Sequence, residues 1–312
     1  MDYREFAQLL LQRDDFLILS HVRPDGDTLG SGSALCSALR RMGKTAYIIR
    51  NPELTERYEP YVAPFFTPDG FAPACVVAVD IAAPNLFPKN FSGAVDFCID
   101  HHPSNTGYAG ETLLHAEKSA CGEAVLELIE EMTGSVTQQE ANLLYIAVTT
   151  DTGCFQYANT NAATLRAAAH LLELGADNRA ISLRFFRKIS RARMALEGMI
   201  YSTMRFFRGG KISIAVITRA MLAQANAAED DCDDLAGLAG KAEHGVVSVT
   251  IRELETGESK VSVRSNPEVD ACAICAVYGG GGHAMAAGCT LDCPPEDAVA
   301  KILQAIEQVW PE

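Results

Sequence analysis

The sequence predicts an α/β protein with two domains, of which the first contains a parallel sheet. At 312 residues the chain is long enough for two domains that each bury a core. Short apolar runs alternate with helical patterns in the first part, whereas strand patterns become frequent after residue 211. We therefore predict a parallel-sheet domain over 1–188, a helical linker over 189–210 and a smaller α/β domain over 211–312.

The elements of the first domain follow from the spacing of its apolar residues. The run from Ala74 to Val79 is apolar throughout, which is typical of a strand that is buried on both faces of a parallel sheet. Thr137 and Glu140 have the spacing of a capping box, which predicts the start of a helix. The patterns predict strands at 15–20, 45–50, 74–79 and 95–99, and helices at 3–13, 34–42, 121–132 and 137–149, with mainly helical structure at 161–206.

In the second domain the patterns predict strands at 212–217, 246–251 and 260–264, and helices at 219–226, 234–242 and 295–309. A run of four glycines between Tyr278 and His283 interrupts these patterns. By itself it is interpreted either as a flexible turn or as a loop whose backbone N–H groups bind phosphate.

Composition and charge restrict the class of protein. The chain has 26 basic and 40 acidic residues and a net charge of −14, which argues against a broad basic surface for long nucleic acid but not against a small phosphorylated substrate. No apolar run is long enough to span a membrane, and the first residues do not resemble a signal peptide. We therefore expect a soluble, cytoplasmic protein without a membrane partner.

The ten cysteines lack the spacing of a disulfide framework, and many of them lie within apolar runs. This usage favours reduced thiols in the core of a cytoplasmic protein. Cys272, Cys275, Cys289 and Cys293 offer a zinc site as the alternative, but their spacing extends over a predicted helix and the glycine run.

Acidic and imidazole side chains follow the predicted strands of the first domain at the point where each strand ends. His21, Asp25 and Asp27 lie in a turn between a strand and a helix, in which Gly30 and Gly32 are expected to let the chain approach a bound group. Further along the chain the same position is taken by Asp80, by Asp100-His101-His102 and, after a helix, by Asp151. Because parallel strands bring their carboxyl ends to one edge of a sheet, these side chains are expected to meet. Taken alone, the first turn could also be a polar loop in which an aspartate caps a helix.

Such a cluster of carboxylates and imidazoles predicts a metal site. The candidate ligands are His21, Asp25, Asp27, Asp80, His101 and Asp151. Six side chains are too many for one ion that must keep positions open for substrate, so two ions that share a carboxylate are predicted. A pair of ions roughly 3.5–4 Å apart can bind a phosphoryl oxygen and generate a hydroxide nucleophile at neutral pH. Histidine among the ligands favours Mn²⁺ over Mg²⁺.

The second domain contributes candidate phosphate ligands. Arg264 and Ser265 end a predicted strand, and an arginine there offers a forked donor that suits phosphate. Gly281 and Gly282 expose backbone N–H groups, and His283 adds a side-chain donor. The alternative is an exposed arginine and a flexible turn without a ligand.

The order and spacing of these motifs resemble the DHH phosphoesterase superfamily, which takes its name from the Asp-His-His found at 100–102. The resemblance also includes His21 to Ser31, Asp80, Asp151 and the Gly-Gly-Gly-His-x-x-Ala-Ala-Gly pattern of the DHH-associated C-terminal domain at 280–288. It extends over nearly the whole chain. It implies two α/β domains that face each other across a cleft, with the metals in the first domain.

The resemblance also implies roles for the site residues. Asp80 would bridge two manganese ions, with His21 and Asp25 on one ion and Asp27, His101 and Asp151 on the other. His102 would contact the scissile phosphate and protonate the leaving oxygen, and Asp100 would orient a histidine without binding metal. Arg264, Ser265, Gly281, Gly282 and His283 would bind the nucleotide. Mg²⁺ or Co²⁺ would be the alternative ions.

Within the superfamily, the short chain resembles the bacterial nano-RNase and pAp phosphatase group. The implied function is hydrolysis of short oligoribonucleotides and of 3′-phosphoadenosine 5′-phosphate (pAp) to AMP. The alternative with the same chemistry is hydrolysis of cyclic di-AMP or linear pApA, and the alternative from another class is a non-catalytic nucleotide-binding regulator. The expected partners are short RNA or nucleotide substrates, without long duplexes, and a homodimer is compatible with the sequence.

Overall fold

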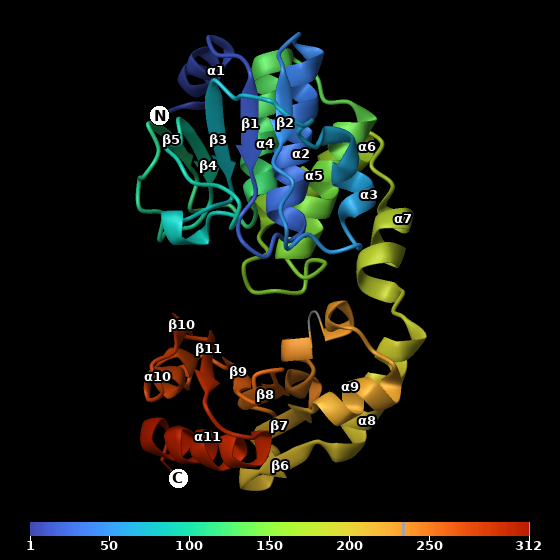
Figure 1. Cartoon of the computed structure of the whole chain (residues 1–312), viewed down its shortest axis with the longest axis vertical. Coiled ribbons are helices and arrows are strands. Elements are labelled where there is room, and N and C mark those ends of the chain that lie inside the picture. The colour runs from blue at the N-terminus through green and yellow to red at the C-terminus, as the bar shows by residue number, and fades with distance from the viewer. Residues whose placement is uncertain (233–234, 312) are drawn as a thin grey trace. The chain divides into compact units, whose positions relative to one another are not determined.

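The computed structural model describes residues 1–232 and 235–311, and its contacts divide the chain into two compact units (Figure 1). The first unit is Met1–Lys188 and the second is Ile189–Glu312. None of the helices in the described part of the chain is both long and apolar enough to span a bilayer.

The first unit is built on a five-stranded sheet in which every neighbouring pair is parallel, as the sequence predicts. The strands are β1 (Phe16–Leu19), β2 (Ala46–Ile48), β3 (Cys75–Val79), β4 (Phe97–Asp100) and β5 (Glu111–Leu114), in the order β2-β1-β3-β4-β5. From β1 the chain therefore runs to β2 on one side of β1, and it then crosses to β3 on the other side. The gap between the carboxyl ends of β1 and β3 is a topological switch point, where open α/β sheets bind their ligands.

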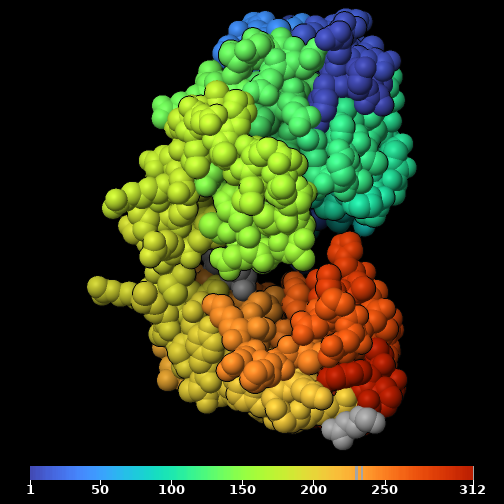
Figure 2. All heavy atoms as spheres, turned by 180° about the vertical axis from the view of Figure 1, so that it is seen from behind, coloured from blue at the N-terminus to red at the C-terminus, as the bar shows by residue number. Residues whose placement is uncertain are grey.

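The helices of the first unit include a group that packs on one face of this sheet. The helices are α1 (Tyr3–Leu11), α2 (Gly26–Arg41), α3 (Glu59–Val62), α4 (Cys121–Thr133), α5 (Gln138–Asp151), α6 (Ala162–Glu173) and α7 (Asn178–Ser182), and a π-helical turn follows at Leu183–Arg187. Side chains of α1, α2, α4 and α5 form one core with the strands, and Figure 2 shows the green to yellow-green segments of α4–α6 at the rear surface. Loops cover the other face, where Leu19, Ile81 and Cys98 are buried. Polar groups at the strand ends therefore lie between helices on one side and loops on the other.

The glycines of α2 have a different role from the one expected. A Cβ atom at Gly30 would lie 2.3 Å from the carbonyl oxygen of Leu143 in α5, and one at Gly32 would lie 3.3 Å from Ile18 of β1. The expectation that these glycines let the chain approach a ligand is therefore wrong. Gly30 lets α2 and α5 pack closely, and Gly32 faces the sheet.

The second unit contains a six-stranded, mainly antiparallel sheet. Its strands are β6 (Arg205–Phe207), β7 (Ile212–Ile217), β8 (Val247–Glu253), β9 (Ser259–Ser265), β10 (Gly281–His283) and β11 (Ala286–Leu291), in the order β10-β11-β9-β8-β7-β6. Its helices are α8 (Arg191–Thr203), α9 (Arg219–Ala225), α10 (Ala271–Ala276) and α11 (Pro295–Val309). Helices α10 and α11 pack on one face of the sheet, and α8 and α9 cover part of the other (Figure 1).

Several local expectations differ from the structure. The glycine run is not entirely a loop, because Gly281–His283 (β10) pair with β11 as a hairpin, with Gly281 opposite Gly288, and only Gly279 and Gly280 remain outside the strand. The helix expected at 234–242 begins at Asp234, which lies outside the described residues, and the remainder consists of the 3₁₀ turns Leu235–Gly237 and Ala239–Lys241. Two glycines in this short segment weaken a helix.

The segment 189–210 contains α8 and β6, and Leu196 and Ile200 of α8 are buried in the second unit.

The cysteines are free thiols, most of them buried, which agrees with the expected reduced core. Within the described residues, no group of three potential metal ligands contains a cysteine. The structure therefore gives no support to the zinc alternative.

We predict that Gly30→Ala destabilises the first unit by about 1–3 kcal/mol, because the added methyl group would overlap a backbone oxygen that cannot rotate away. Gly32→Ala is the matched control in the same helix. Its methyl group meets a side chain that can shift, and alanine favours the helix by about 1 kcal/mol. Guanidinium denaturation followed by circular dichroism measures both, and equal stability of the two variants would contradict the close packing of α2 and α5.

Candidate metal centre

The six predicted ligands come together at the carboxyl edge of the parallel sheet. His21 follows β1, Asp80 follows β3 and His101 follows β4, while Asp25 and Asp27 lie at the start of α2. The sixth residue, Asp151, ends α5. Segments that are far apart in sequence therefore meet at the switch point of the sheet.

The six predicted ligands form two groups that lie on either side of Asp80, and a third group of potential metal ligands, Asp80, His101 and His102, overlaps them. In the first group the Nε2 atom of His21 lies 3.5 Å from Asp25 Oδ1 and 3.8 Å from Asp80 Oδ2. In the second group His101 Nε2 lies 3.8 Å from both Asp27 Oδ2 and Asp151 Oδ2. His101 Nε2 is also 3.4 Å from Asp80 Oδ1, so the two oxygens of Asp80 face different groups.

Asp80 combines burial, backbone strain and an oxygen without a partner. Its backbone has a φ of 62°, in the left-handed region that non-glycine residues rarely adopt. The side chain is 4% exposed, and within the described residues its Oδ1 atom is buried without a hydrogen bond. Because an unpaired buried carboxylate oxygen is costly, a cation at this point would satisfy it. The donor set thus fits a hard divalent metal ion.

The histidines present Nε2 to this centre because their other ring nitrogen is held by the backbone. The Nδ1 atom of His21 donates to the carbonyl of Val22 at 2.7 Å, and that of His101 donates to the carbonyl of Lys118 at 3.1 Å. Carbonyl oxygens can only accept, so these contacts place the Nδ1 proton and leave Nε2 to face the carboxylates. The backbone thereby gives both imidazole rings the orientation that is usual for histidines that bind metals.

Asp27 is anchored to the N-terminus of a different helix. Its Oδ2 atom accepts a hydrogen bond from the backbone N–H of Cys121 at 2.7 Å, and its Oδ1 atom accepts one from Gly122 at 2.9 Å. The hydroxyl of Ser31 donates to Oδ1 as well. The first residues of α4 thus hold an acidic side chain from α2, where the helix dipole favours negative charge.

Asp25 caps its own helix, so the alternative interpretation of the first turn is also correct. Its Oδ1 atom accepts from the backbone N–H groups of Asp27 and Thr28 at 3.0 and 3.2 Å. No hydrogen bond is formed by Oδ2 within the described part of the chain, and this atom is free to bind another group. One aspartate thus begins α2 and also faces His21.

Asp100 and His102 form a separate pair next to the two groups. The carboxylate of Asp100 is buried and accepts from His102 Nδ1 at 2.8 Å, and Asn105 donates to its other oxygen at 2.6 Å. The Nδ1 atom of His102 also lies 3.5 Å from Asp80 Oδ1. Because this nitrogen already donates to Asp100, His102 is less suited to bind a metal through it than His101.

The electrostatics show that protons occupy the centre in the absence of a cation. Burial raises the pKa of Asp80 to about 7 and that of Asp151 to about 8, and the charge of Asp27 adds to both shifts. Burial alone would lower the pKa of His21 and His101, but the nearby carboxylates outweigh it and raise these values to about 9 and about 10. A divalent cation would replace these protons.

Two of the predicted substrate ligands of the second unit, Arg264 and His283, lie in one row across its sheet. His283 pairs with Ala286, and Ala286 pairs with Arg264, so the side chains of all three point to the same face. Arg264 and His283 are exposed. Ser265 differs, because its hydroxyl donates to the carbonyl of Val269 at 2.6 Å and is therefore already used within the loop.

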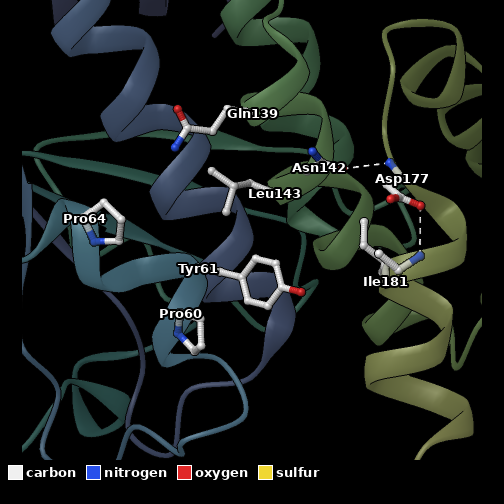
Figure 3. Close-up of a pocket in the computed structure, with 9 residues that line it drawn as sticks. Pro60, Tyr61, Pro64, Gln139, Asn142, Leu143, Asp177 and Ile181 are labelled. Atoms are coloured by element: carbon white, nitrogen blue, oxygen red, sulfur yellow. Dashed lines mark hydrogen bonds between the residues drawn. The ribbon is translucent and has the colours of Figure 1, made fainter.

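A pocket in the first unit contains none of these residues. It is lined by α3, α5 and α7, and Figure 3 shows Tyr61 and Leu143 on its walls and Asn142 bonded to Asp177. Leu143 precedes Asp151 by eight residues of α5, which is about 12 Å along a helix. The pocket therefore lies away from the metal-ligand groups.

Comparison with known proteins agrees with this arrangement. A family model described as the DHH family, N-terminal domain, matches residues 15–148, and one described as the DHHA1 domain matches residues 209–311. A protein of Thermus thermophilus called bifunctional oligoribonuclease and PAP phosphatase NrnA is 35% identical over 93% of this chain and 89% of its own. The chain belongs to the DHH family.

Two further similarities extend over nearly the whole of this DHH chain. A Bacillus subtilis protein with the same name is 25% identical over 92% of both chains. The crystal structure of an exopolyphosphatase-related protein from Bacteroides fragilis superposes with a TM-score of 0.88 and 23% identity, covering 98% of this chain and 95% of that one. This last similarity shows the fold.

Sequence reasoning missed the residues that hold the candidate ligands of this DHH protein in place. Ser31, Asn105 and Lys118 each contact a candidate ligand or its neighbour. Only Ser31 stands at a spacing that could have indicated its contact, since it follows Asp27 by four residues in a helix. The others lie in loops, where no periodic pattern predicts the partner.

We predict that the metal-free protein loses stability as the pH rises from about 6 to 8.5. Four pKa values at the centre are raised on folding, so the folded state binds more protons than the unfolded state in this range. The stabilisation that such a group contributes is fully present below the pKa that the group has in the unfolded chain. It is lost as the pH rises through the pKa that the group has in the folded protein. The measurement is Tm against pH in a chelator. A rise of Tm over this range would contradict the assignment.

The same shifts predict the response to metal. The increase in Tm caused by Mg²⁺ should grow with pH, because fewer protons must be displaced. Calorimetry in two buffers of different ionisation enthalpy would measure the protons released on binding. Binding without proton release at about pH 7 would contradict the raised pKa values.

Proposed function

We propose that this protein is a manganese-dependent phosphohydrolase that degrades short oligoribonucleotides and converts pAp to AMP. The observation that supports this proposal most strongly is the meeting of six acidic and imidazole side chains in two groups on either side of Asp80. The names of the T. thermophilus and B. subtilis relatives, which align over nearly their full length, supply the substrate class.

The two groups suit two ions with one shared ligand. His21, Asp25 and Asp80 would hold one ion, and Asp27, Asp80, His101 and Asp151 the other. Bound divalent ions polarise a phosphoryl oxygen and lower the pKa of water to near neutrality. The mixture of oxygen ligands with two imidazoles favours Mn²⁺, with Mg²⁺ or Co²⁺ as alternatives.

His102 is positioned to supply a proton. Its bond to Asp100 raises the pKa of the imidazole, so the ring is protonated over a wider pH range. A protonated imidazole beside the centre can donate to the oxygen that leaves phosphorus. Asp100, held by Asn105, orients the ring and does not bind metal.

The second unit is proposed to bind the nucleotide. Arg264 provides a planar, forked cation for a phosphate group, and His283 provides a further donor on the same face of the sheet. Gly281 and Gly288 form the neighbouring row on the same face, and a Cβ at Gly281 would meet no atom within 4 Å, so the sheet surface is open there. Of the five residues predicted to bind substrate, Ser265 is the one whose hydroxyl already has a partner, so we expect the smallest effect from its loss.

The experiment that tests the function is hydrolysis of a diribonucleotide and of pAp by the purified chain with Mn²⁺. Cyclic di-AMP, linear pApA and pyrophosphate serve as comparison substrates. Turnover of the first two at higher kcat/KM than the others supports the proposal. Binding of nucleotide without turnover with Mn²⁺, Mg²⁺ or Co²⁺ would instead indicate a regulator.

Asp80→Asn should abolish measurable turnover, because the variant loses the carboxylate charge that both groups share. Asp96→Asn is the matched control, since Asp96 lies at the other end of β4 and accepts from the backbone of Val76. The control should lose stability but retain kcat. Equal activity of the two variants would reject Asp80 as the shared ligand.

His102→Ala should lower kcat by about 10²- to 10⁴-fold, the range of a general acid, and leave the Mn²⁺ affinity nearly unchanged. Steady-state kinetics and titration calorimetry measure the two effects. A large loss of Mn²⁺ affinity would show that His102 is a metal ligand and not a proton donor.

Arg264→Ala should raise KM for pAp at least tenfold with a smaller effect on kcat, as expected for a lost charge-assisted contact worth about 1.5–3 kcal/mol. Arg205→Ala is the control, because Arg205 lies in β6 at the opposite edge of the same sheet and pairs with Glu296. An equal change of KM in both variants would contradict a specific role for Arg264.

A further inference from the structure

The short segment 118–122 contacts two members of one ligand group and is linked to the third through Asn159. The carbonyl of Lys118 accepts from His101, and the backbone N–H groups of Cys121 and Gly122 donate to Asp27. The third member, Asp151, is reached through Asn159, whose side-chain amide donates to the carbonyls of both Ser119 and Asp151 at 3.1 and 3.2 Å. No corresponding contact from this segment to His21 or Asp25 occurs in the described part of the chain.

The loop that follows Asp151 needs such support, because its backbone is strained. Gly153, Cys154 and Phe155 have φ values of 55°, 55° and 65°, so three consecutive residues lie in the left-handed region. For each non-glycine residue this costs of order 1–3 kcal/mol and persists only where surrounding contacts hold it. The bond from Asn159 back to the Asp151 carbonyl closes this loop.

Ser119 is in turn held by two buried residues, and neither forms a hydrogen bond or ion pair with the metal-ligand groups in the described part of the chain. Glu123 is 3% exposed, and its Oε1 atom accepts from the backbone N–H of Ser119 and from the hydroxyl of Thr164, both at 3.0 Å. Thr164 is fully buried, and its Oγ1 atom lies 2.6 Å from that of Ser119. The hydroxyl of Ser119 donates to the carbonyl of Asn159 at 2.5 Å.

We propose that Glu123 and Thr164 are positioning residues for one of the two metal ions. By holding Ser119 they set the place of segment 118–122, and with it the separation of Asp27, His101 and Asp151. This inference rests on the proposed function, because it assumes that these three residues bind a cation. It adds that the two ions depend on different supporting residues, so one can be weakened while the other is retained.

The variants are chosen to separate positioning from general stability. Thr164→Val keeps the shape of the side chain and removes the hydroxyl that links Glu123 to Ser119. Glu123→Ala removes both hydrogen bonds, whereas Glu123→Gln keeps an oxygen that can accept them and should rescue binding. Glu140→Ala is the matched control, because Glu140 is also fully buried and accepts from the residue before its helix, Thr137, but lies at the start of α5, away from the centre.

The measurement is calorimetric titration of Mn²⁺ into the metal-free full chain, with Tm recorded for every variant. The wild type should bind two ions. Thr164→Val and Glu123→Ala should weaken one of them by about 10- to 100-fold, the usual effect of residues that orient ligands, and leave the other unchanged. Glu123→Gln should bind both ions nearly as the wild type does. Glu140→Ala should lower Tm without changing either affinity.

Three outcomes would overturn the inference. If Thr164→Val and Glu123→Ala bind both ions as the wild type does, Ser119 does not depend on them. If Glu140→Ala weakens the same ion equally, the effect is one of general stability. If the wild type neither binds Mn²⁺ nor hydrolyses substrate, the proposed function fails and the inference with it, whereas normal wild-type binding and turnover with unchanged variants rejects only the positioning role.

Discussion

The first unit holds several carboxylates close together at the edge of its sheet, two of them, Asp27 and Asp80, buried. Asp27, Asp80 and Asp151 face one another across His101, and burial together with their mutual repulsion raises their pKa values. Such a cluster is unfavourable unless protons or cations lie within it. The parallel sheet provides the necessary geometry, because its strand ends converge at the switch point, and the strained backbone at Asp80 directs one carboxylate between the two histidines.

The surroundings of the centre compensate for this cost with directed donors and acceptors. Backbone carbonyls orient His21 and His101, the start of α4 binds Asp27, and Asn105 supports Asp100. Each contact restricts the orientation of a side chain at the centre. The centre is thus preorganised by loops and helix ends that the sheet holds in place, which is the arrangement that catalysis by positioned charges requires.

The second unit differs from the first, because it has a core of its own and carries an exposed polar row on its sheet. The glycine run was interpreted as a flexible turn or a phosphate-binding loop, but pairing with β11 makes its last two residues, Gly281 and Gly282, part of an edge strand. Strand β5 was not predicted from the sequence, because apolar and polar residues alternate only weakly in it. Its pairing with β4 depends on tertiary contacts. By contrast, the capping box at Thr137 and the apolar run before Asp80 were predicted correctly, because both signals are local.

The sequence by itself determined the parallel sheet of the first unit and the residues that end its strands. This was possible because apolar runs of strand length are local, and because parallel strands necessarily bring their carboxyl ends together. Only the tertiary structure decided which atoms meet: that Asp25 also caps α2, that Asp27 binds the start of α4, and that Ser119 bonds to Asn159 in the loop after Asp151. The last two contacts join residues tens of positions apart, and no periodicity or propensity encodes a partner at that distance.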